Sequence, residues 1–304
     1  MRREFSLLLA IGCLLLILAL SAPGFFSIAN LRDVLLTNIP VLVAGIGMTA
    51  VILLGEIDVS IGSQFAICSV AAGLLAKMGW PMPVLAVGAA ATGVLLGALN
   101  GALIAWIGIP SIVVTLATMV ILRDGLRWAT GGEWVQNLPR SFQWMGFSQL
   151  AGQIVIAIIA IALFFLCVWG MRYLTVGRAV YATGSDRESA RLAGIHTRAM
   201  IFGSFAWMGA LTGIAALLNS IRFSDLQSNA GTGLELKTIA AVVVGGVAIT
   251  GGRGTLIGTL LGVGLLGIIG PALTFLGVNA YWEKAIQGAI ILAAVAIDRI
   301  ARKK

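Results

Sequence analysis

The sequence predicts an all-α, polytopic membrane protein of about ten transmembrane helices, and three observations lead to this fold class. Of the 304 residues, 59% are hydrophobic and 11% are charged, whereas soluble domains carry about 25% charged residues. Apolar runs of the roughly 20 residues that a bilayer requires recur along the whole chain. Glycines stand inside these runs, where they let membrane helices approach closely. A soluble protein is excluded because so much apolar sequence would leave no polar surface for water.

The apolar runs predict ten spans in chain order. They are expected at residues 5–21, 39–54, 60–77, 84–106, 109–129, 153–173, 199–221, 238–250, 255–277 and 281–297. The first run has the basic start of a secretory signal peptide, but no clean cleavage site follows it, so we expect a retained helix. Span 238–250 is short enough to be a half-helix. Pro110 predicts a tight hairpin between the fourth and fifth spans.

Ten spans place both termini on one side of the membrane, and the basic residues indicate which side. With a cytoplasmic N-terminus, twelve of the twenty basic residues fall in inside segments: Arg2, Arg3, Arg172, Arg178, Arg187, Arg191, Arg198, Arg253, Arg299, Arg302, Lys303 and Lys304. Cytoplasmic segments are enriched in Lys and Arg, so both termini are expected in the cytoplasm. The net charge of +8 is thus explained by membrane topology, and nucleic acid is not expected as a partner.

The sequence lacks the motifs with which it could catalyse a reaction or use ATP by itself. No Gly-x-x-x-x-Gly-Lys-Ser/Thr phosphate loop occurs. The Gly-rich break at residues 250–254 has no Lys-Ser/Thr and no soluble strand before it, which favours irregular backbone at membrane depth over a phosphate loop. No cluster has metal-ligand spacing, and no nucleophile–base pair is evident. We therefore expect no enzymatic activity, no metal and no cofactor.

Two long segments are predicted on the outside, at residues 130–152 and 222–237. Both mix charged residues with aromatic ones, which suits the docking of a soluble partner as well as an ordinary solvated loop. Seven of the eight tryptophans lie at or near span ends, as in an aromatic belt. Trp207 lies nearer the middle of its span and is expected to pack between helices.

The longest polar stretch on the predicted cytoplasmic side lies at about residues 174–198. Ser185 with Glu188 three residues later predicts a capping box at a helix start, and Gly194 suits the left-handed residue that ends a helix. We expect a short helix over residues 185–194. It could be an ordinary amphipathic connector, or a rigid peg that docks in the groove of a partner.

This stretch resembles the cytoplasmic coupling loop of sugar-type ABC importer permeases, the membrane subunits of ribose, other simple-sugar and autoinducer-2 importers. The matching residues are Gly177-Arg178-x-x-Tyr181-Ala182-x-Gly184 and Ala190-Arg191-x-x-Gly194-Ile195. Other motifs of the family follow in the same order: Gly55-Glu56-Ile57-Asp58-Val59-Ser60-Ile61-Gly62, Asn100-Gly101, Ile109-Pro110-Ser111-Ile112-Val113-Val114-Thr115-Leu116, Gly231-Thr232-Gly233-Leu234-Glu235-Leu236, and the glycines from Gly245 to Gly254. The resemblance runs from about residue 5 to 300. Residues 130–139 are closer to the autoinducer-2 and rhamnose branch than to the ribose branch.

The resemblance implies a type II importer fold, with residues 1–304 forming one permease domain in the bacterial inner membrane. Its expected partners are two cytoplasmic ATPase domains, which bind the ATP, a second permease copy or homologue, and a periplasmic solute-binding protein. The solute would be a simple sugar, rhamnose or autoinducer-2. The residues expected to couple to the ATPase are Gly177, Arg178, Tyr181, Gly184, Ser185, Arg187, Glu188, Ala190, Arg191 and Gly194.

Candidates for the translocation pathway are Asp58, Asn100, Thr115 and Thr118, because a neutral solute requires only hydroxyl and amide groups along its path. Each of the three uncharged residues could instead hydrogen-bond a neighbouring helix. Asp58 and Glu56 lie in a break between two spans. They are either exposed in a short cytoplasmic turn, with Asp58 capping the next helix, or part of a broken helix beside the pathway. Glu56 replaces the family's usual Gly, which puts an essential role for its charge in doubt.

Two rival functions belong to other classes. An ion-coupled secondary transporter would need intramembrane acids or discontinuous helices that form an ion site, and few acids lie in the centres of the predicted spans. A membrane-embedded enzyme would need a catalytic constellation, which the sequence does not show.

Overall fold

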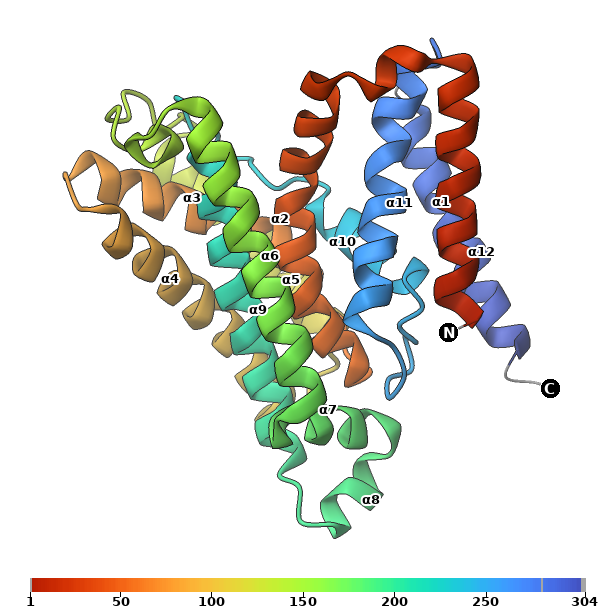
Figure 1. Ribbon diagram of the computed structural model, residues 1–304. Coiled ribbons are helices and arrows are strands. Elements are labelled where there is room, and N and C mark those ends of the chain that lie inside the picture. The colour runs from red at the N-terminus through yellow and green to blue at the C-terminus, as the bar shows by residue number, and fades with distance from the viewer. Residues whose placement is uncertain (1, 280, 302–304) are drawn as a thin grey trace.

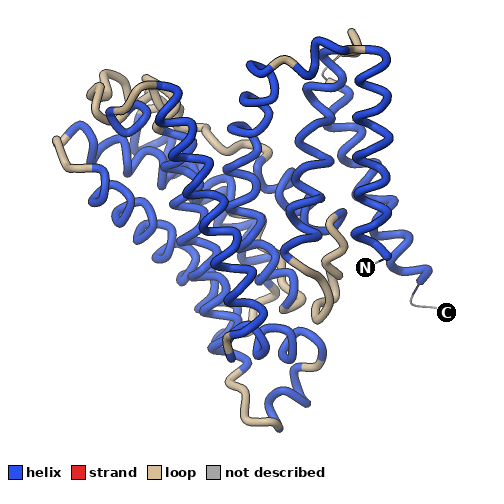
Figure 2. Tube along the Cα trace, viewed as in Figure 1, coloured by secondary structure: helices blue, strands red, loops and turns tan. Residues whose placement is uncertain are grey.

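The computed structural model describes residues 2–279 and 281–301, and within them the backbone is helical with connecting loops (Figure 2). The long helices are α1 (Arg2–Ser21), α2 (Ile28–Leu53), α3 (Ile61–Lys77), α4 (Met82–Ala102), α5 (Ser111–Thr130), α6 (Gln149–Tyr173), α9 (Thr197–Ser220), α11 (Leu256–Phe275) and α12 (Trp282–Ala301). The shorter ones are α7 (Thr175–Ser185), α8 (Arg187–Leu192) and α10 (Leu234–Val244), with single turns η1 (Pro23–Phe26), η2 (Leu103–Ile107) and η3 (Gln143–Gly146). The described residues, 2–279 and 281–301, form no strand.

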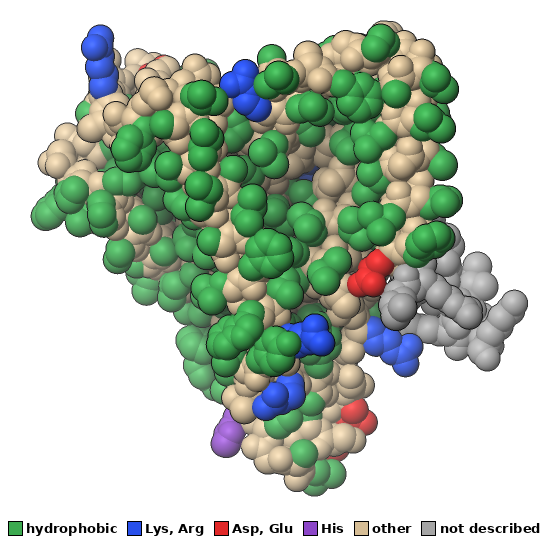
Figure 3. Space-filling model, in the orientation of Figure 1, with side chains coloured by type: hydrophobic (Ala, Val, Ile, Leu, Met, Phe, Trp, Pro, Cys, Tyr) green, Lys and Arg blue, Asp and Glu red, His purple; other side chains and the backbone are tan. Residues whose placement is uncertain are grey.

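The surface and the helix lengths are those of a membrane protein. Six of the described helices are long and apolar enough to cross a bilayer: α1, α2, α4 with η2, α6, α9 and α11. Apolar side chains cover the middle of the visible face, and the basic side chains lie toward its two ends (Figure 3). The chain is therefore an integral membrane protein with several spans.

Each of the ten predicted spans overlaps a helix, although not every helix meets the length and hydropathy of a crossing. α10 has 11 residues, which confirms the predicted half-helix. The number of crossings stays a prediction. The start predicted for the second span, residue 39, is wrong because α2 already begins at Ile28. The hydroxyl of Ser27 accepts a hydrogen bond from the Asn30 N–H and starts the helix there.

Helix α2 lies between two groups of helices (Figure 1). On one side it contacts α10 and α11, which pack with α1 and α12; on the other it contacts α9, which packs with α3 and α4. This position explains why most of the second half of α2 is buried. The first residues of α1 and the last residues of α12 lie at the same end as α7 and α8 (Figure 1). Residues 302–304, on which the predicted cytoplasmic C-terminus partly depends, lie outside the described residues.

The most extensive helix contact, between α4 and α9, is made by glycines. A Cβ atom on Gly93 would collide with the carbonyl of Gly209, and one on Gly97 with the carbonyl of Phe205. The two backbones touch directly, as expected where small residues let membrane helices approach. The sequence-based inference that the internal glycines mark a tightly packed bundle is confirmed at this pair of helices.

Two breaks in the helices lie at the same end of the molecule. Residues 54–60 connect α2 to α3, and residues 245–255 connect α10 to α11. The two breaks are joined directly, because the Gly252 N–H donates to the Leu53 carbonyl oxygen at 2.8 Å. The helices α7 and α8 pack against this joint, which makes it the centre of the candidate site.

Candidate functional site

The polar stretch at 174–198 forms two helices: α8 lies within the predicted range 185–194, whereas α7 was not predicted and the predicted capping box at Ser185 is wrong. Ser185 is the last residue of α7, and the cap of α8 is Asp186. The Asp186 carboxylate accepts hydrogen bonds from the N–H groups of Glu188, at 2.9 Å, and Ser189, at 3.0 Å. These bonds, chiefly the one from Ser189, lower the pKa of Asp186. Gly194 has φ +83° and ends the segment in the left-handed conformation, as predicted.

α7 lies against the end of α6 and reaches the second break. Gly177 allows this packing, because a Cβ atom there would collide with the backbone of Met171. From the next turn, the Tyr181 hydroxyl donates to the Gly254 carbonyl oxygen at 2.9 Å. Arg178 donates to the carbonyl oxygen of Tyr173 at 3.2 Å and so caps the C-terminus of α6.

Gly184, at the end of α7, sits where the two breaks meet. A Cβ atom at Gly184 would collide with the Leu53 carbonyl oxygen and lie 2.8 Å from the Gly252 nitrogen. Gly252 has φ +73°, and a Cβ atom there would lie 2.6 Å from the Ser185 hydroxyl oxygen. We call residues 53–56, 184–187 and 250–254 the junction. Only glycine fits at positions 184 and 252 of this junction.

An ion pair completes the junction. The Arg187 guanidinium donates to the Glu56 carboxylate at 2.5 Å and to the Leu54 carbonyl oxygen at 3.1 Å. Glu56 is buried, and Arg187 is half exposed. Glu56 therefore has a specific partner on α8, although its departure from the family pattern had put a role for its charge in doubt.

Beyond Glu56 the chain enters a buried polar network. The Asp58 carboxylate accepts hydrogen bonds from the Ser60 N–H at 2.8 Å, the Ser60 hydroxyl at 2.6 Å and the Gln64 amide at 3.0 Å. The Asn100 amide of α4 donates to the Ser60 hydroxyl oxygen at 2.9 Å. The N-cap of α3 is Ser60, and Asp58 holds this residue rather than itself capping the helix, which one alternative had expected. Asp58 is 0% exposed. The exposed turn proposed in that alternative is thus wrong for Asp58.

The same segment is tied to α5. The Ile57 N–H donates to the Ser111 hydroxyl oxygen at 3.2 Å, and the Thr115 hydroxyl lies 3.3 Å from the Ile57 carbonyl oxygen. Asp58, Asn100 and Thr115, three of the four pathway candidates, are thus brought together around residues 57–60. Thr118 stands apart, since its hydroxyl donates within α5 to the carbonyl of Val114. All four side chains are buried within the protomer.

The side of α8 that faces away from the junction is exposed to solvent. Ala190 is buried, whereas Ser185, Glu188 and Arg191 are exposed, and Arg191 pairs with Glu188 at 2.7 Å. Leu192 is 79% exposed. The sequence reasoning did not single out Leu192, although an apolar residue in a short polar helix was a signal for a contact with a partner.

At the opposite end of the molecule the two predicted outside segments are joined. Val135 and Leu226 exchange backbone hydrogen bonds of 2.9 and 3.0 Å, and the Trp144 N–H donates to the Ile221 carbonyl oxygen at 2.8 Å. Glu235, placed by sequence in the loop 222–237, is instead buried in the first turn of α10. It pairs with Arg123 of α5 at 3.5 Å, beside Gly62.

A polar cavity of about 400 Å³ opens at this end, between α2, α10 and α12. Its polar side chains are those of Thr37, Asn219, Thr232, Lys237, Tyr281, Glu283, Lys284 and Gln287. For metals, the described part of the chain holds no group of three His, Cys, Asp or Glu side chains that could bind an ion.

Comparison with known proteins identifies a family and several relatives that are similar to this chain in sequence. Residues 30–295 match the family described as "Branched-chain amino acid transport system / permease component". The protein "Autoinducer 2 import system permease protein LsrC" of Salmonella typhi is 34% identical over 301 residues, which cover 97% of this chain and 85% of the relative. The protein of the same name from Shigella flexneri is 34% identical over 296 residues, which cover 97% of this chain and 86% of the relative. No solved structure matches the chain.

Proposed function

The chain belongs to the ABC importer permeases of the branched-chain amino acid transport system / permease component family, and we propose that it moves a neutral, sugar-like solute across the bacterial inner membrane. A permease of this kind is a transport subunit, and it works with ATPase and solute-binding partners.

The observation that carries the coupling proposal is the junction. On its solvent side, α8 offers Glu188, Arg191 and Leu192 to a partner. On its inner side, Gly184 and Arg187 contact both helix breaks without any intervening element. Movement of α8 by an ATPase would therefore shift residues 54–60 and 250–254 directly, and the first of these leads into the network around Asp58.

The proposed assembly has two permease copies, two ATPase domains and one solute-binding protein. The binding protein would dock on the joined outer segments, at residues 130–148 and 221–233, which form one surface through the Val135–Leu226 pairing. Both termini and the junction would then face the cytoplasm. The pathway would lie between the two permease copies and switch between outward and inward access as the ATPases close and open.

Autoinducer 2 is the first candidate solute, because the relatives named above import it. Simple sugars and rhamnose follow. The hydroxyl and amide groups of the outer cavity suit the hydroxyl groups of such solutes. A branched-chain amino acid is the second candidate, because Lys237 and Glu283 line the same cavity and could meet its carboxylate and ammonium groups.

The test is uptake by the complete system in proteoliposomes that contain the chain, its ATPase and its binding protein. We expect ATP-driven uptake of labelled autoinducer 2, ribose or rhamnose, and none of labelled leucine. Leucine uptake alone would favour the second candidate. The chain reconstituted by itself should neither hydrolyse ATP nor accumulate solute when a proton or sodium gradient is imposed. Gradient-driven accumulation would favour the ion-coupled secondary transporter instead.

A further inference from the structure

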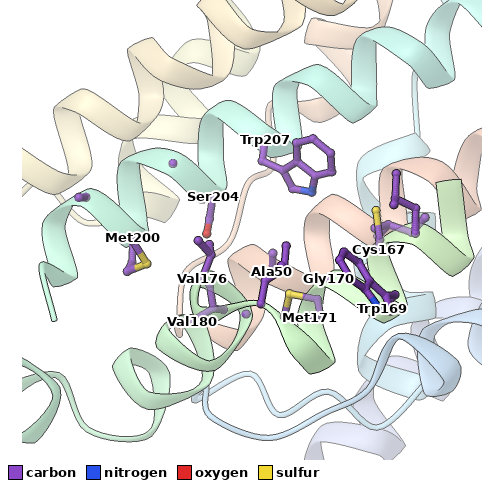
Figure 4. A pocket seen from close by; sticks show the side chains of 16 residues that line it. Ala50, Cys167, Trp169, Gly170, Met171, Val176, Val180, Met200, Ser204 and Trp207 are labelled. Atoms are coloured by element: carbon purple, nitrogen blue, oxygen red, sulfur yellow. The ribbon is translucent and has the colours of Figure 1, made fainter.

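A second cavity, of about 470 Å³, lies beside the junction, and its lining is apolar, unlike that of the polar outer cavity. It is bordered by α2, α6, α7 and α9 (Figure 4). Trp207 and Ser204 of α9 lie across it from Trp169 and Met171 of α6, while Val176 and Val180 of α7 form another wall (Figure 4). Of its sixteen lining residues, Ser204 contributes the single hydroxyl group. We call this cavity the α6–α9 crevice.

The crevice is open to the outside of the protomer. Trp207 is 44% exposed, so the expectation that it packs between helices is wrong: its indole ring borders the crevice instead. Trp169, Leu166 and Val176 are exposed as well. An apolar opening of this size on a membrane protein is not suited to a hydroxyl-rich solute, because the solute would lose its hydrogen bonds to water without replacing them.

The crevice lies at the depth of the leaflet on the junction side. Ala50 is within one turn of the end of α2, and Met171 is within one turn of the end of α6. The wall formed by α7 belongs to the segment outside the predicted spans. If the junction faces the cytoplasm, the crevice opens into the acyl region of the cytoplasmic leaflet, just below the headgroups.

Three arginines lie on the helices that border this level, one each on α6, α7 and α9. Arg172, Arg178 and Arg198 are exposed, and each directly follows or precedes a residue that lines the crevice. Among the residues that the structure describes, no carboxylate forms an ion pair with any of the three. In Figure 3, basic side chains gather around the lower ends of α6 and α9. Basic pockets at the cytoplasmic ends of membrane helices bind anionic lipid headgroups.

We propose that the α6–α9 crevice binds one anionic phospholipid, with an acyl chain between Trp169 and Trp207 and the phosphate held by Arg172, Arg178 and Arg198. The volume is within the range of about 300–1,000 Å³ that small-ligand sites provide. The bound acyl chain would contact α7 at Val176 and Val180, on the same helix face as Gly184 and one to two turns before it. The lipid would thereby hold the connection between α6 and α8 in place when α8 is moved.

The experiment measures tryptophan quenching in the full chain, reconstituted in nanodiscs that contain brominated phosphatidylglycerol or brominated phosphatidylcholine at equal bromine content. We expect stronger quenching by the anionic lipid, and loss of the difference in a Trp169→Phe/Trp207→Phe variant. Replacing Arg172, Arg178 and Arg198 by Gln should lower the relative affinity for phosphatidylglycerol by about fivefold for each group that contacts the phosphate. Arg32→Gln, on α2 at the other end of the molecule, is the control and should leave it unchanged.

A second variant fills the crevice without touching the charges. A Cβ atom on Gly203 meets no atom within 4 Å, so Gly203→Phe should fold and occupy the acyl position. Gly12→Phe on α1 is the matched control, since that position is equally open. Gly203→Phe should remove the preference for phosphatidylglycerol, and Gly12→Phe should keep it.

Two results would overturn the proposal. One is equal quenching by both lipids in the unmodified chain. The other is weak quenching by either lipid together with cross-linking of two copies through Gly203→Cys, in a background without Cys13, Cys68 and Cys167. That outcome would mean that a second permease copy covers the crevice.

Discussion

The Arg187 guanidinium and the Glu56 carboxylate lie 2.5 Å apart, although 131 residues separate them in the sequence. This pair links α8 to the break after α2. Because the Arg187 side chain is 51% exposed, the attraction is screened by solvent and adds little to stability. The pair instead fixes the position of α8 relative to the break after α2.

Neutralising this pair is therefore expected to affect coupling more than folding. Glu56→Gln and Arg187→Gln should each keep the thermal unfolding midpoint close to that of the unmodified chain, while ATP hydrolysis by the complex becomes uncoupled from uptake. The measurement is the ratio of solute transported to ATP hydrolysed. The swapped pair Glu56→Arg/Arg187→Glu should recover part of this ratio. Arg127→Gln, which removes an exposed pair with Asp124, is the control and should change nothing.

Gly184→Ala tests the contact of α7 with the two breaks. The added methyl group would collide with the Leu53 carbonyl oxygen, so the variant should lose about 1–3 kcal/mol of stability, as overpacked sites do. Thermal unfolding in detergent is the measurement. Gly125→Ala in α5 is the matched control, because a Cβ atom there meets no atom within 4 Å. A stable Gly184→Ala variant with normal uptake would contradict the packing described for the junction.

Asp186 is expected to hold the first turn of α8. Asp186→Ala should increase amide hydrogen exchange over residues 187–192, whereas Asp186→Asn should keep the cap and the protection. The lowered pKa of Asp186 means that the cap is present above the ordinary carboxyl pKa and is lost only as the pH falls through the lower folded value. Exchange at residues 187–192 should therefore show no cap-dependent change between about pH 5 and 8. Equal exchange in Asp186→Ala and the unmodified chain would show that the cap does not hold α8.

Leu192 is expected to be buried by the ATPase partner. Burying a leucine side chain contributes about 1.5–3 kcal/mol, so Leu192→Asp should weaken ATPase binding roughly tenfold or more. The dissociation constant of the reconstituted permease and its ATPase subunit measures this. Leu192→Met conserves the apolar volume and should bind normally. Unchanged binding by Leu192→Asp would move the contact away from the tip of α8.

The topology can be tested by cysteine labelling in a background without Cys13, Cys68 and Cys167. Ser224→Cys, in the exposed outer segment, should react with a membrane-impermeant reagent in intact cells. Ser185→Cys, in the exposed part of the junction, should react only after the membrane is opened. Ser228 lies in the same outer segment but is buried, which makes it unsuitable as the reporter. The reverse pattern would place the junction outside.

Local patterns in the sequence predicted the features that depend on neighbouring residues. Apolar runs located the helices, the short run 238–250 predicted the half-helix α10, and Gly194 predicted where α8 ends. The cap of α8 was assigned one residue too early. Ser185 and Asp186 are both good capping residues, and the continuation of α7 through Ser185 decides between them.

The features that depend on distant residues could not be predicted in this way. No local pattern shows that Arg187 faces Glu56, or that Arg123 faces Glu235, because these contacts arise only when separate helices pack. The burial of Asp58 has the same origin. Its partners Ser60 and Gln64 are close in sequence, but the helices that exclude water from it include α4, which supplies Asn100.

The glycine contact between α4 and α9 also has a consequence for the order in which the chain is assembled. α4 ends at Ala102 and α9 begins at Thr197, so the ribosome completes one face of the contact well before it starts the other. At a synthesis rate of about 5–20 residues per second, α4 would wait in the bilayer for roughly 5–20 seconds. During this interval lipid must cover the face that contains Gly93 and Gly97, and α9 must displace that lipid when it inserts. Chains truncated before Thr197 should therefore insert α4 into the membrane and leave it without its principal packing partner.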